Sequence, residues 1–236
     1  MRAILILTAI ELEARALARA LRLDPLPSLS RFAFGAAGLR VAPVGLRAAL
    51  LDARWPALLD GLDRPLVISA GVCGALDPTL GSGDLVVPES VIDLTGALAN
   101  VTPSSHRAAL AAAPGAATAP LITTRDLVAT PEAKADLFAR TGAAAVDMES
   151  SLLLSQAAAA GLPSLVVRAV SDTARETLPP EVATLLTPEG RVKVASAVKL
   201  LAHPRALPRT LTLQRAAARA LDRVAGVLAT FARGSS

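Results

Sequence analysis

The sequence predicts an α/β protein with a central sheet covered by helices. Two short apolar runs, residues 3–7 and 65–70, have the length of strands rather than helices. A third run at 164–170 is too short for a helix and too uniformly apolar for a strand with one face in water, so we expect it at the centre of the sheet. Helix-forming stretches rich in Ala and Leu lie between these runs.

Length and composition point to one folded unit. The chain has 236 residues, 53% of them hydrophobic, so it can bury a sizeable core, and we expect a single domain over residues 1–236. No apolar run approaches the roughly 18 residues of a membrane-spanning helix. Because acidic residues rather than a cleavage site follow the apolar start at 3–7, we expect no signal peptide, a soluble protein and a cytoplasmic location.

Composition also argues against several classes of ligand. Cys73 is the only cysteine, and in its apolar, Gly-rich surroundings we expect a small buried residue rather than a nucleophile. His106 and His203 are the only histidines and lack metal-ligand spacing, so we expect neither a metal nor another cofactor. With 2% aromatic residues and no basic block at a net charge of +4, nucleic-acid binding is not expected.

The first strand leads into a helix that ends near residue 21 and begins with Glu11 and Glu13. Acidic residues in a first turn interact favourably with the helix dipole, which explains Glu11 without any further role. The strand at 65–70 ends in Gly71 and Gly74, which let a ligand approach the backbone closely. The remaining elements before residue 143 are strands at 31–34, 39–44, 85–87 and 121–124, helices at 46–62, 105–113 and 131–141 (with Thr130 as N-cap), and a loop at 93–105.

Carboxylates stand at two junctions of the next segment. Asp147 and Glu149 immediately precede an apolar run at 151–160, which predicts a buried helix with these acids in its first turn. Asp172 follows the central strand at 164–170. Because ligands of open α/β sheets bind beyond the carboxyl ends of the strands, we expect Glu149 and Asp172 to face one crevice.

The motifs VDMES at 146–150 and VVRAVSD at 166–172 resemble the paired signature of the purine nucleoside phosphorylase and methylthioadenosine/adenosylhomocysteine nucleosidase superfamily. The longer segments TGAAAVDMES, AGLPSLVVRAVSD and LPPEV, and the tail at 187–223, look most like nucleoside phosphorylase-like proteins associated with hopanoid biosynthesis. The similarity covers most of the chain and is weakest over 20–60 and 93–120. It implies a three-layer fold with a mixed, twisted central sheet flanked by helices, and cleavage of the N-glycosidic bond of an adenine nucleoside.

Breaking such a bond makes the sugar resemble an oxocarbenium ion while negative charge flows into the base, so the leaving purine must be protonated. The resemblance assigns the acid to Asp172, which we expect Val166, Val167 and Val170 to keep protonated by desolvation. Glu149, kept ionised, would accept hydrogen bonds from the ribose hydroxyls.

The resemblance assigns further residues to substrate and water. Met148 would pack against the ribose face, and Glu13 stands where the nucleosidases keep the carboxylate that activates the attacking water. Ser171, beside the acid, and Gly71, at the Gly-rich strand end, complete the predicted substrate contacts. The remaining charges of the two motifs, Asp147 and Arg168, are expected to be structural and paired.

The sequence departs from the family at two places. Residues 125–128 correspond to the segment in which the nucleosidases bind adenine through backbone groups and an aromatic ring, but no aromatic is present, so we expect Leu127 and Val128 to line the base pocket. The phosphorylases place an Arg and a Ser on phosphate at the Gly-rich strand end, where this chain has Ser69 and Val72. Neither binds an anion as Arg does, so water is favoured as the nucleophile.

Alternatives stay open at this point. Arg15, Arg40 or Arg47 could supply a phosphate site from elsewhere, so phosphate remains a possible co-substrate of a purine nucleoside phosphorylase. A methylthioadenosine/adenosylhomocysteine nucleosidase is a second alternative. A catalytically silent nucleoside-binding protein is a third, although binding alone does not need a protonatable acid at the base.

The resemblance to the hopanoid-associated group implies adenosylhopane as substrate, an adenine nucleoside with a large lipid at its 5′ position. Such a lipid-linked substrate would be met at a membrane. The predicted helix at 207–231, which follows another at 190–202, carries Arg209, Arg215, Arg219 and Arg223 near i, i+4 spacing beside an apolar face. This pattern fits a helix lying peripherally on the inner face of an anionic membrane as well as a helix packed on the sheet. We also expect a homodimer.

Overall fold

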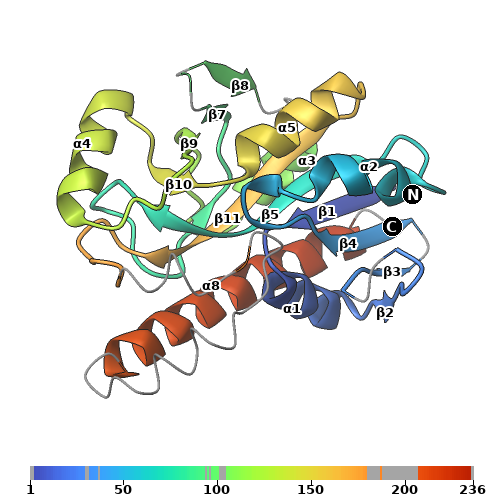
Figure 1. The fold of residues 1–236 in the computed structure, drawn as a ribbon, viewed down its shortest axis with the longest axis horizontal. Coiled ribbons are helices and arrows are strands. Elements are labelled where there is room, and N and C mark those ends of the chain that lie inside the picture. Colours follow the sequence, from blue (N-terminus) through green and yellow to red (C-terminus); the bar gives the residue numbers. More distant parts are fainter. Residues whose placement is uncertain are drawn as a thin grey trace.

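The computed structural model of the protein describes residues 3–29, 32–36, 38–93, 95, 97–100, 105–179, 187 and 207–234. The described strands form one mixed sheet, with helices on both of its faces (Figure 1), which confirms the predicted fold class. The strands are β1 (Ile4–Thr8), β2 (Asp24–Pro25), β3 (Phe34–Ala36), β4 (Leu39–Pro43), β5 (Leu66–Ala75), β6 (Leu85–Val86), β7 (Ser90–Ile92), β8 (Leu98–Asn100), β9 (Leu121–Thr123), β10 (Ala145–Asp147) and β11 (Ser164–Asp172). The helices are α1 (Glu11–Leu21), the 3₁₀ helix η1 (Leu46–Ala48), α2 (Leu51–Leu59), α3 (Ser105–Ala111), α4 (Pro131–Thr141), α5 (Ser150–Ala159) and α8 (Leu207–Gly234).

Strand β1 shows why the strand sequences are apolar throughout. Ile4 and Ile6 point into the core shared with α1 and α8, whereas Leu5 and Leu7 point into the core shared with α2 and α5. Successive side chains of a strand alternate between faces, so both faces of the sheet are buried under helices. The result is a three-layer arrangement in which α1 and α8 lie on one side and α2 and α5 on the other (Figure 1).

Strand β5 is the axis of the sheet. Its first half lies between β1 and β11, and both neighbours are parallel to it. At Gly74 and Ala75, β10 becomes its antiparallel neighbour, while β11 continues on the other edge. The strand was expected to end at residue 70. It continues to Ala75 because these two partners pair with the Gly-rich half.

The predicted helix at 46–62 is wrong at its start. Only η1 and, after a break, the helix α2 form in this region. Arg47 and Ala48 adopt left-handed φ angles of 53° and 55°, which a continuous α-helix cannot contain. The turn makes α2 shorter than predicted.

Two further expectations need correction. The segment at 93–105 is not all loop, because β8 forms there and pairs antiparallel with β7. Asp147 and Glu149 do not lie in the first turn of α5: Asp147 ends β10, and Glu149 is the N-cap residue. The predicted N-cap Thr130 is confirmed, since its Oγ1 accepts a hydrogen bond from the Ala133 nitrogen at 3.3 Å. The predicted helix at 190–202 lies outside the described residues.

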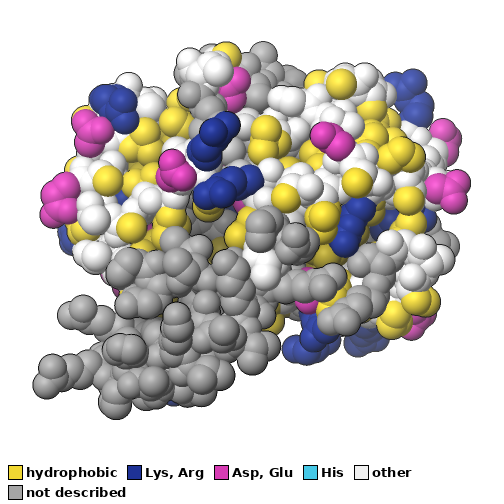
Figure 2. Space-filling view, in the orientation of Figure 1, with side chains coloured by type: hydrophobic (Ala, Val, Ile, Leu, Met, Phe, Trp, Pro, Cys, Tyr) yellow, Lys and Arg dark blue, Asp and Glu magenta, His cyan; other side chains and the backbone are white. Residues whose placement is uncertain are grey.

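Helix α8 packs on β11 and α1. Its apolar side chains, among them Ala220, Val224 and Leu228, are buried in the core, and Arg215, Arg219 and Arg223 are exposed. The packed-helix interpretation of this sequence is therefore confirmed. No helix within the described part of the chain is long and apolar enough to cross a membrane. On the face shown in Figure 2, positive and negative side chains of the described residues are interspersed rather than gathered into a basic area.

Candidate active site

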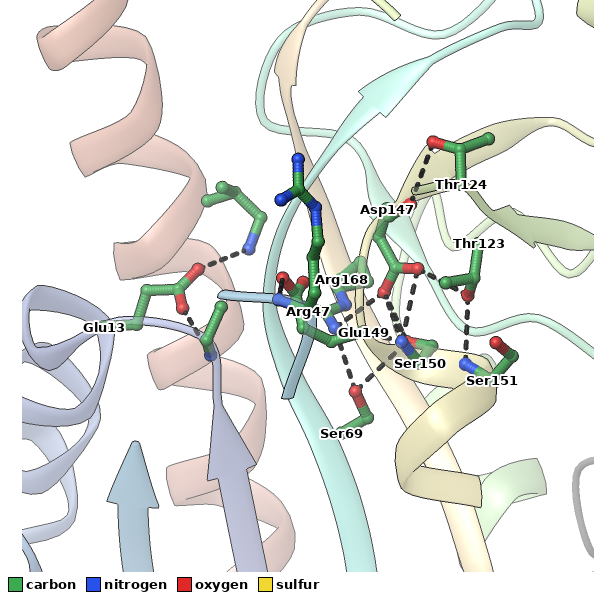
Figure 3. Close-up of polar contacts among 12 residues, drawn as sticks. Glu13, Arg47, Ser69, Thr123, Thr124, Asp147, Glu149, Ser150, Ser151 and Arg168 are labelled. Atoms are coloured by element: carbon green, nitrogen blue, oxygen red, sulfur yellow. Dashed lines mark hydrogen bonds and ion pairs between the residues drawn. The ribbon is translucent and has the colours of Figure 1, made fainter. Parts of the chain in front are cut away.

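The candidate site surrounds the Gly-rich half of β5, residues 71–74. Helix α1 reaches it beyond the carboxyl end of β1, and β11 and the β10–α5 junction flank it on either side. Figure 3 shows the polar contacts that link these elements.

Glu13 is held at the start of α1 by backbone donors from the turn after β1 and from within β5. Its Oε2 accepts hydrogen bonds from the nitrogens of Ala9 and Ile10 at 3.0 and 3.1 Å, and its Oε1 accepts one from the Val72 nitrogen at 3.1 Å. The side chain is buried. Burial raises the pKa of Glu13, while the charge of Arg168 and these backbone hydrogen bonds act in the opposite direction.

Gly71 leaves the space in which Glu13 and Arg168 meet. A Cβ atom on Gly71 would lie 2.5 Å from Glu13 Oε1 and 2.5 Å from Arg168 Nη1. The φ angle of Gly71 is 154°, a value that favours glycine. A carboxylate and a guanidinium therefore converge on one point beside the strand, and this point requires a glycine.

Arg168 and Asp147 form a buried ion pair, with 2.7 Å between Nη2 and Oδ2, as predicted. Arg168 Nη2 also contacts Ser69 Oγ at 2.9 Å and Ser150 Oγ at 3.1 Å. Asp147 accepts hydrogen bonds from the Ser150 nitrogen and hydroxyl and from Thr123 Oγ1. Burial lowers the pKa of Arg168, but the carboxylates of Asp147, Glu149 and Glu13 around it raise the pKa above its usual value, so Arg168 stays cationic.

Glu149 is buried at the N-terminus of α5, and its Oε1 accepts a hydrogen bond from the Arg47 nitrogen at 2.9 Å. Burial and the neighbouring charge of Asp147 raise the pKa of Glu149 to about 7, while Arg168 opposes this change. A carboxyl group with this pKa changes its protonation state near neutral pH.

Asp172 lies at the end of β11, where the pairing with β5 is shifted by a bulge between Val170 and Asp172. A Cβ on Gly74 would lie 3.0 Å from Asp172 Oδ2, so Asp172 is three residues along β5 from the point where Glu13 and Arg168 meet. Ser171 Oγ donates to Asp172 Oδ1 at 2.7 Å and lies 3.1 Å from the Cys73 carbonyl oxygen. The predicted acid and Ser171 are thus brought to the same edge as Glu13.

The environment of Asp172 differs from the expected apolar one. Its Oδ2 lies 2.7 Å from the Nζ atom of Lys134, which is fully buried. The two groups form a buried ion pair. Val166 and Val170 instead pack in the core that contains α8. The protonation of Asp172 by valine desolvation stays a prediction.

Met148 lines a cavity of about 360 Å³ together with Arg47, Thr124, Arg125 and Leu152. Arg47 reaches across its edge, because its Nε donates to the Arg125 carbonyl oxygen at 2.7 Å and its Nη2 lies 3.6 Å from Asp126 Oδ1. The other two proposed phosphate ligands are engaged elsewhere. Arg15 stacks on Phe32 at 4.7 Å, and Arg40 donates to three carbonyl oxygens at the end of α2.

Leu127 and Val128 do not line this cavity. Both are half-buried, and Val128 packs on a small apolar cluster with Leu76 and Val146. The Leu178 nitrogen donates to the Ala129 carbonyl oxygen at 2.8 Å, so this segment lies beside the chain that follows Asp172. The role of Leu127 and Val128 at the base stays a prediction.

Cys73 is buried in β5, and burial raises the pKa of its thiol well above the usual range. This confirms the expectation of a small buried residue rather than a nucleophile. Among the described residues, no group of three or more His, Cys, Asp or Glu side chains is arranged to hold a metal ion.

A family model described as the phosphorylase superfamily matches residues 55–202. The chain belongs to the phosphorylase superfamily. The match contains β5, the β10–α5 junction and β11, and thus the elements that carry Gly71, Glu149 and Asp172. No curated protein matches the chain.

Solved structures of the same fold extend over nearly the whole chain. The 5′-methylthioadenosine/S-adenosylhomocysteine nucleosidase of Helicobacter pylori is 18% identical, with 99% of this chain and 98% of that chain covered and a TM-score of 0.70. The corresponding nucleosidase of S. pneumoniae is 17% identical, with 99% and 100% covered and a TM-score of 0.72. The futalosine hydrolase of Helicobacter pylori is 18% identical, with 99% and 98% covered and a TM-score of 0.68. At this identity the likeness extends to the fold alone.

Sequence reasoning missed Lys134 and considered Arg47 only as a possible phosphate ligand. Lys134 occupies one position of an ordinary-looking helix, and Arg47 lies in a turn that was predicted to be helical. The side chain of Arg168 was expected to be structural, yet it also borders the point beside Gly71. A lysine among apolar positions of α4 was the one available signal for Lys134.

Proposed function

We propose that the protein is an enzyme that cleaves the N-glycosidic bond of an adenine nucleoside with water and releases adenine. The observation that carries this proposal is the arrangement of carboxylates along β5: Glu13 meets Arg168 over Gly71, and Asp172 lies beside Gly74. Hydrolysis needs an acid at the leaving base and a group that orients water at the sugar, and these are the two carboxyl groups available for those tasks.

Each side chain has a task in this mechanism. As the bond between the sugar and the purine breaks, its electrons pass to the base, which receives a proton through Asp172. The oxygen of a water molecule held beside Glu13 and Arg168 bonds to the sugar carbon, and Glu13 accepts a proton from that water. Glu149, when ionised, accepts hydrogen bonds from the ribose hydroxyls and stabilises the cationic sugar, and Met148 packs on the ribose.

Water rather than phosphate is the proposed nucleophile. Ser69 is fully buried and bonded to Arg168 and Ser150, and the Val72 nitrogen is already bonded to Glu13. These are the positions at which the resemblance placed the phosphate ligands of phosphorylases. A phosphate dianion there would also meet the Glu13 carboxylate at short range, and like charges repel.

For the nucleoside itself we propose adenosylhopane, as the resemblance implies. Two large apolar side chains of the described residues are exposed, and one of them, Leu152, lines the site cavity. Leu12, 63% exposed, precedes Glu13, and Leu152, 39% exposed, lines the cavity with Met148. Apolar groups at the edge of the site would suit a 5′ substituent that is itself apolar.

The test is a comparison of substrates by chromatographic measurement of free adenine. The purified protein is incubated with adenosylhopane in mixed micelles, a short 5′-alkyl adenosine, methylthioadenosine and adenosylhomocysteine, each with and without phosphate. We expect phosphate-independent adenine release, fastest from the 5′-lipidated nucleoside. A ribose 1-phosphate product would show that the protein is a phosphorylase. Preference for adenosylhomocysteine would show that it is a methylthioadenosine/adenosylhomocysteine nucleosidase. Binding without cleavage would show that it is a silent nucleoside-binding protein. The variant Asp172→Asn is the control for contaminating activity.

A lipid-linked substrate would be met at the inner face of the membrane. Arg215, Arg219 and Arg223 lie on the exposed side of α8, and each contributes about 1 kcal/mol near an anionic surface. Salt-sensitive co-sedimentation with anionic liposomes, absent with neutral liposomes, is the expected result. We also retain the homodimer as part of the proposal, and light scattering of the purified protein measures it.

A further inference from the structure

Lys134 is a lysine that the fold buries completely. It lies on α4, with no exposed surface, and lysine is among the residues that are almost never buried unless they are paired. Its Nζ atom has three hydrogen-bond acceptors, which are Asp172 Oδ2 at 2.7 Å, the Thr173 carbonyl oxygen at 2.7 Å and the Glu176 carbonyl oxygen at 3.0 Å. All three protons of the ammonium group are therefore used.

The three acceptors belong to one short segment, which begins at the proposed acid. Residues 173–176 form a turn in which the Thr173 nitrogen donates to Glu176 Oε2 at 2.7 Å and the Glu176 nitrogen donates to the Thr173 carbonyl oxygen at 3.1 Å. The hydrogen bonds of the Lys134 ammonium group all go to this segment rather than to other residues of α4. Its contacts serve only to hold Asp172 and the turn that follows it.

The arrangement raises a question about the proton that the base must receive. Asp172 Oδ2 accepts a hydrogen bond from the Lys134 ammonium group, and a carboxylate that accepts this bond must first receive a proton before it can deliver one to the base. The other oxygen, Oδ1, accepts the Ser171 hydroxyl, which is far too weak an acid to supply a proton. The ammonium group of Lys134 is the acidic group in direct contact with this carboxylate.

We propose that Lys134 supplies, through Asp172, the proton that the leaving purine takes up. One N–H proton of Lys134 moves to Asp172 and a proton of Asp172 moves to a ring nitrogen of the base, while the electrons of the glycosidic bond pass into the base. Asp172 ends as a carboxylate and Lys134 as a neutral amine, which solvent protonates after adenine has left. Lys134 does not touch the substrate in this scheme and acts as a positioning and proton-supplying residue.

This inference rests on the proposed function and is tested with three variants. Lys134→Met removes the charge, and Lys134→Arg keeps a positive charge on a group that does not lose its proton at accessible pH. Arg140→Met, which breaks the exposed ion pair of Arg140 with Asp136 on the same helix, is the matched control. The substrates are the nucleoside that the wild type cleaves and a nitrophenyl riboside with the same 5′ group, whose leaving group needs no proton.

We expect Lys134→Met and Lys134→Arg each to lower kcat for adenine release by about 100-fold, the size of a lost general acid, and to change KM by less than about threefold. Both variants should cleave the nitrophenyl riboside at the wild-type rate, which also shows that the site is folded. In the Asp172→Asn background, Lys134→Met should cost less than about threefold more, because residues that act as one unit are not additive. Arg140→Met should leave both reactions unchanged.

The outcomes separate the inference from the function on which it rests. Wild-type adenine release by Lys134→Arg overturns the proton supply, and equal loss on both substrates overturns it as well, because a structural defect affects both. If Lys134→Met does not fold, the double variant Lys134→Met/Asp172→Asn, which buries no unpaired charge, gives the same comparison against Asp172→Asn alone. Absence of adenine release by the wild-type protein overturns the proposed function, and this inference with it.

Discussion

The Val72 nitrogen donates a hydrogen bond to Glu13 Oε1 at 3.1 Å. This contact joins the first turn of α1 to the Gly-rich half of β5, so a carboxylate of the chain itself occupies a backbone donor within this strand. An anion-binding strand end needs free N–H groups or a cation. Here the guanidinium of Arg168 lies next to the same carboxylate, because its Nη1 and Glu13 Oε1 converge on one point beside Gly71.

Glu13→Gln is expected to lower adenine release by about 100-fold, the scale of a lost general base. An amide presents one N–H₂ group, and in this pocket three backbone donors face the two carboxylate oxygens, so one donor must lose its acceptor. A fall in Tm should therefore accompany the loss of turnover. Steady-state kinetics and thermal unfolding measure both effects, and Glu11→Gln in the same first turn is the control. A fully active Glu13→Gln variant would remove Glu13 from the water-activating role.

Glu149 is expected to impose an acid limb on the pH profile of kcat/KM. Its pKa is raised to about 7 by burial and by Asp147, and only the ionised form can accept hydrogen bonds from two ribose hydroxyls. Below about pH 7, kcat/KM should fall by about tenfold per pH unit, because this parameter reports on the free enzyme. The profile from pH 5 to 9 measures the limb, and Glu149→Gln should abolish it along with most of the activity. A limb that persists in Glu149→Gln belongs to another group.

Glu149 should also make stability depend on pH. Activity is expected to rise with pH as Glu149 ionises, whereas stability is expected to fall. The pKa of Glu149 is higher in the folded state, about 7, than its ordinary value of 4.5, so the unfolded state ionises first as the pH rises. The contribution of Glu149 to the free energy of unfolding is then fully present below about pH 4.5 and is lost as the pH rises to about 7. One pKa unit corresponds to about 1.4 kcal/mol, so the loss is on the order of 3 kcal/mol. Because Glu149→Gln stays neutral, its Tm relative to the wild type should rise between pH 5 and pH 8, and an unchanged difference would contradict this linkage.

Sequence patterns predicted Glu149 and Asp172 because each stands at a strand–helix or strand–loop junction, whereas Glu13 was assigned from the resemblance. Glu13 follows β1, Glu149 follows β10 and Asp172 ends β11, and the carboxyl ends of strands meet at one edge of an α/β sheet. The pairing of Asp147 with Arg168 was also predictable, since both are charged residues within buried apolar runs and must be compensated.

The remaining features depend on tertiary structure that local patterns do not contain. The left-handed turn at Arg47 and Ala48 is stabilised by the contact between the Arg47 nitrogen and Glu149, 102 residues away in sequence. Strand β10 is only three residues long, and pairing with β5 and β9 defines it. The burial of Lys134 depends on its contacts with Asp172, Thr173 and Glu176, which lie 38 to 42 residues further along the chain.

Gly71→Ala is expected to reduce both stability and activity. A Cβ atom at this position would lie 2.5 Å from Glu13 Oε1 and Arg168 Nη1, so these groups must move apart. Overpacking of this kind costs typically about 1–3 kcal/mol. Gly226→Ala is the matched control, because Gly226 lies in α8 with nothing within 4 Å of its added Cβ, and alanine there should stabilise the helix. Thermal unfolding and adenine release measure the contrast. An undisturbed Gly71→Ala variant would show that Glu13 and Arg168 need not meet at this point.

Arg47→Gly is expected to leave adenine release within about threefold of the wild type and not to lower the Tm. The left-handed φ of 53° costs a non-glycine residue about 1–2 kcal/mol, which glycine relieves, although the more flexible unfolded chain offsets part of this gain. The backbone hydrogen bond from residue 47 to Glu149 survives the substitution. The lost ion pair with Asp126 and the lost hydrogen bond to the Arg125 carbonyl oxygen are both exposed and contribute little. Of the three arginines considered for a phosphate site, Arg47 is the one that lines the cavity with Met148. Turnover by Arg47→Gly should therefore be the same with and without phosphate. If phosphate stimulates the wild-type rate and this substitution abolishes the stimulation, the protein is a phosphorylase with Arg47 as its anion ligand.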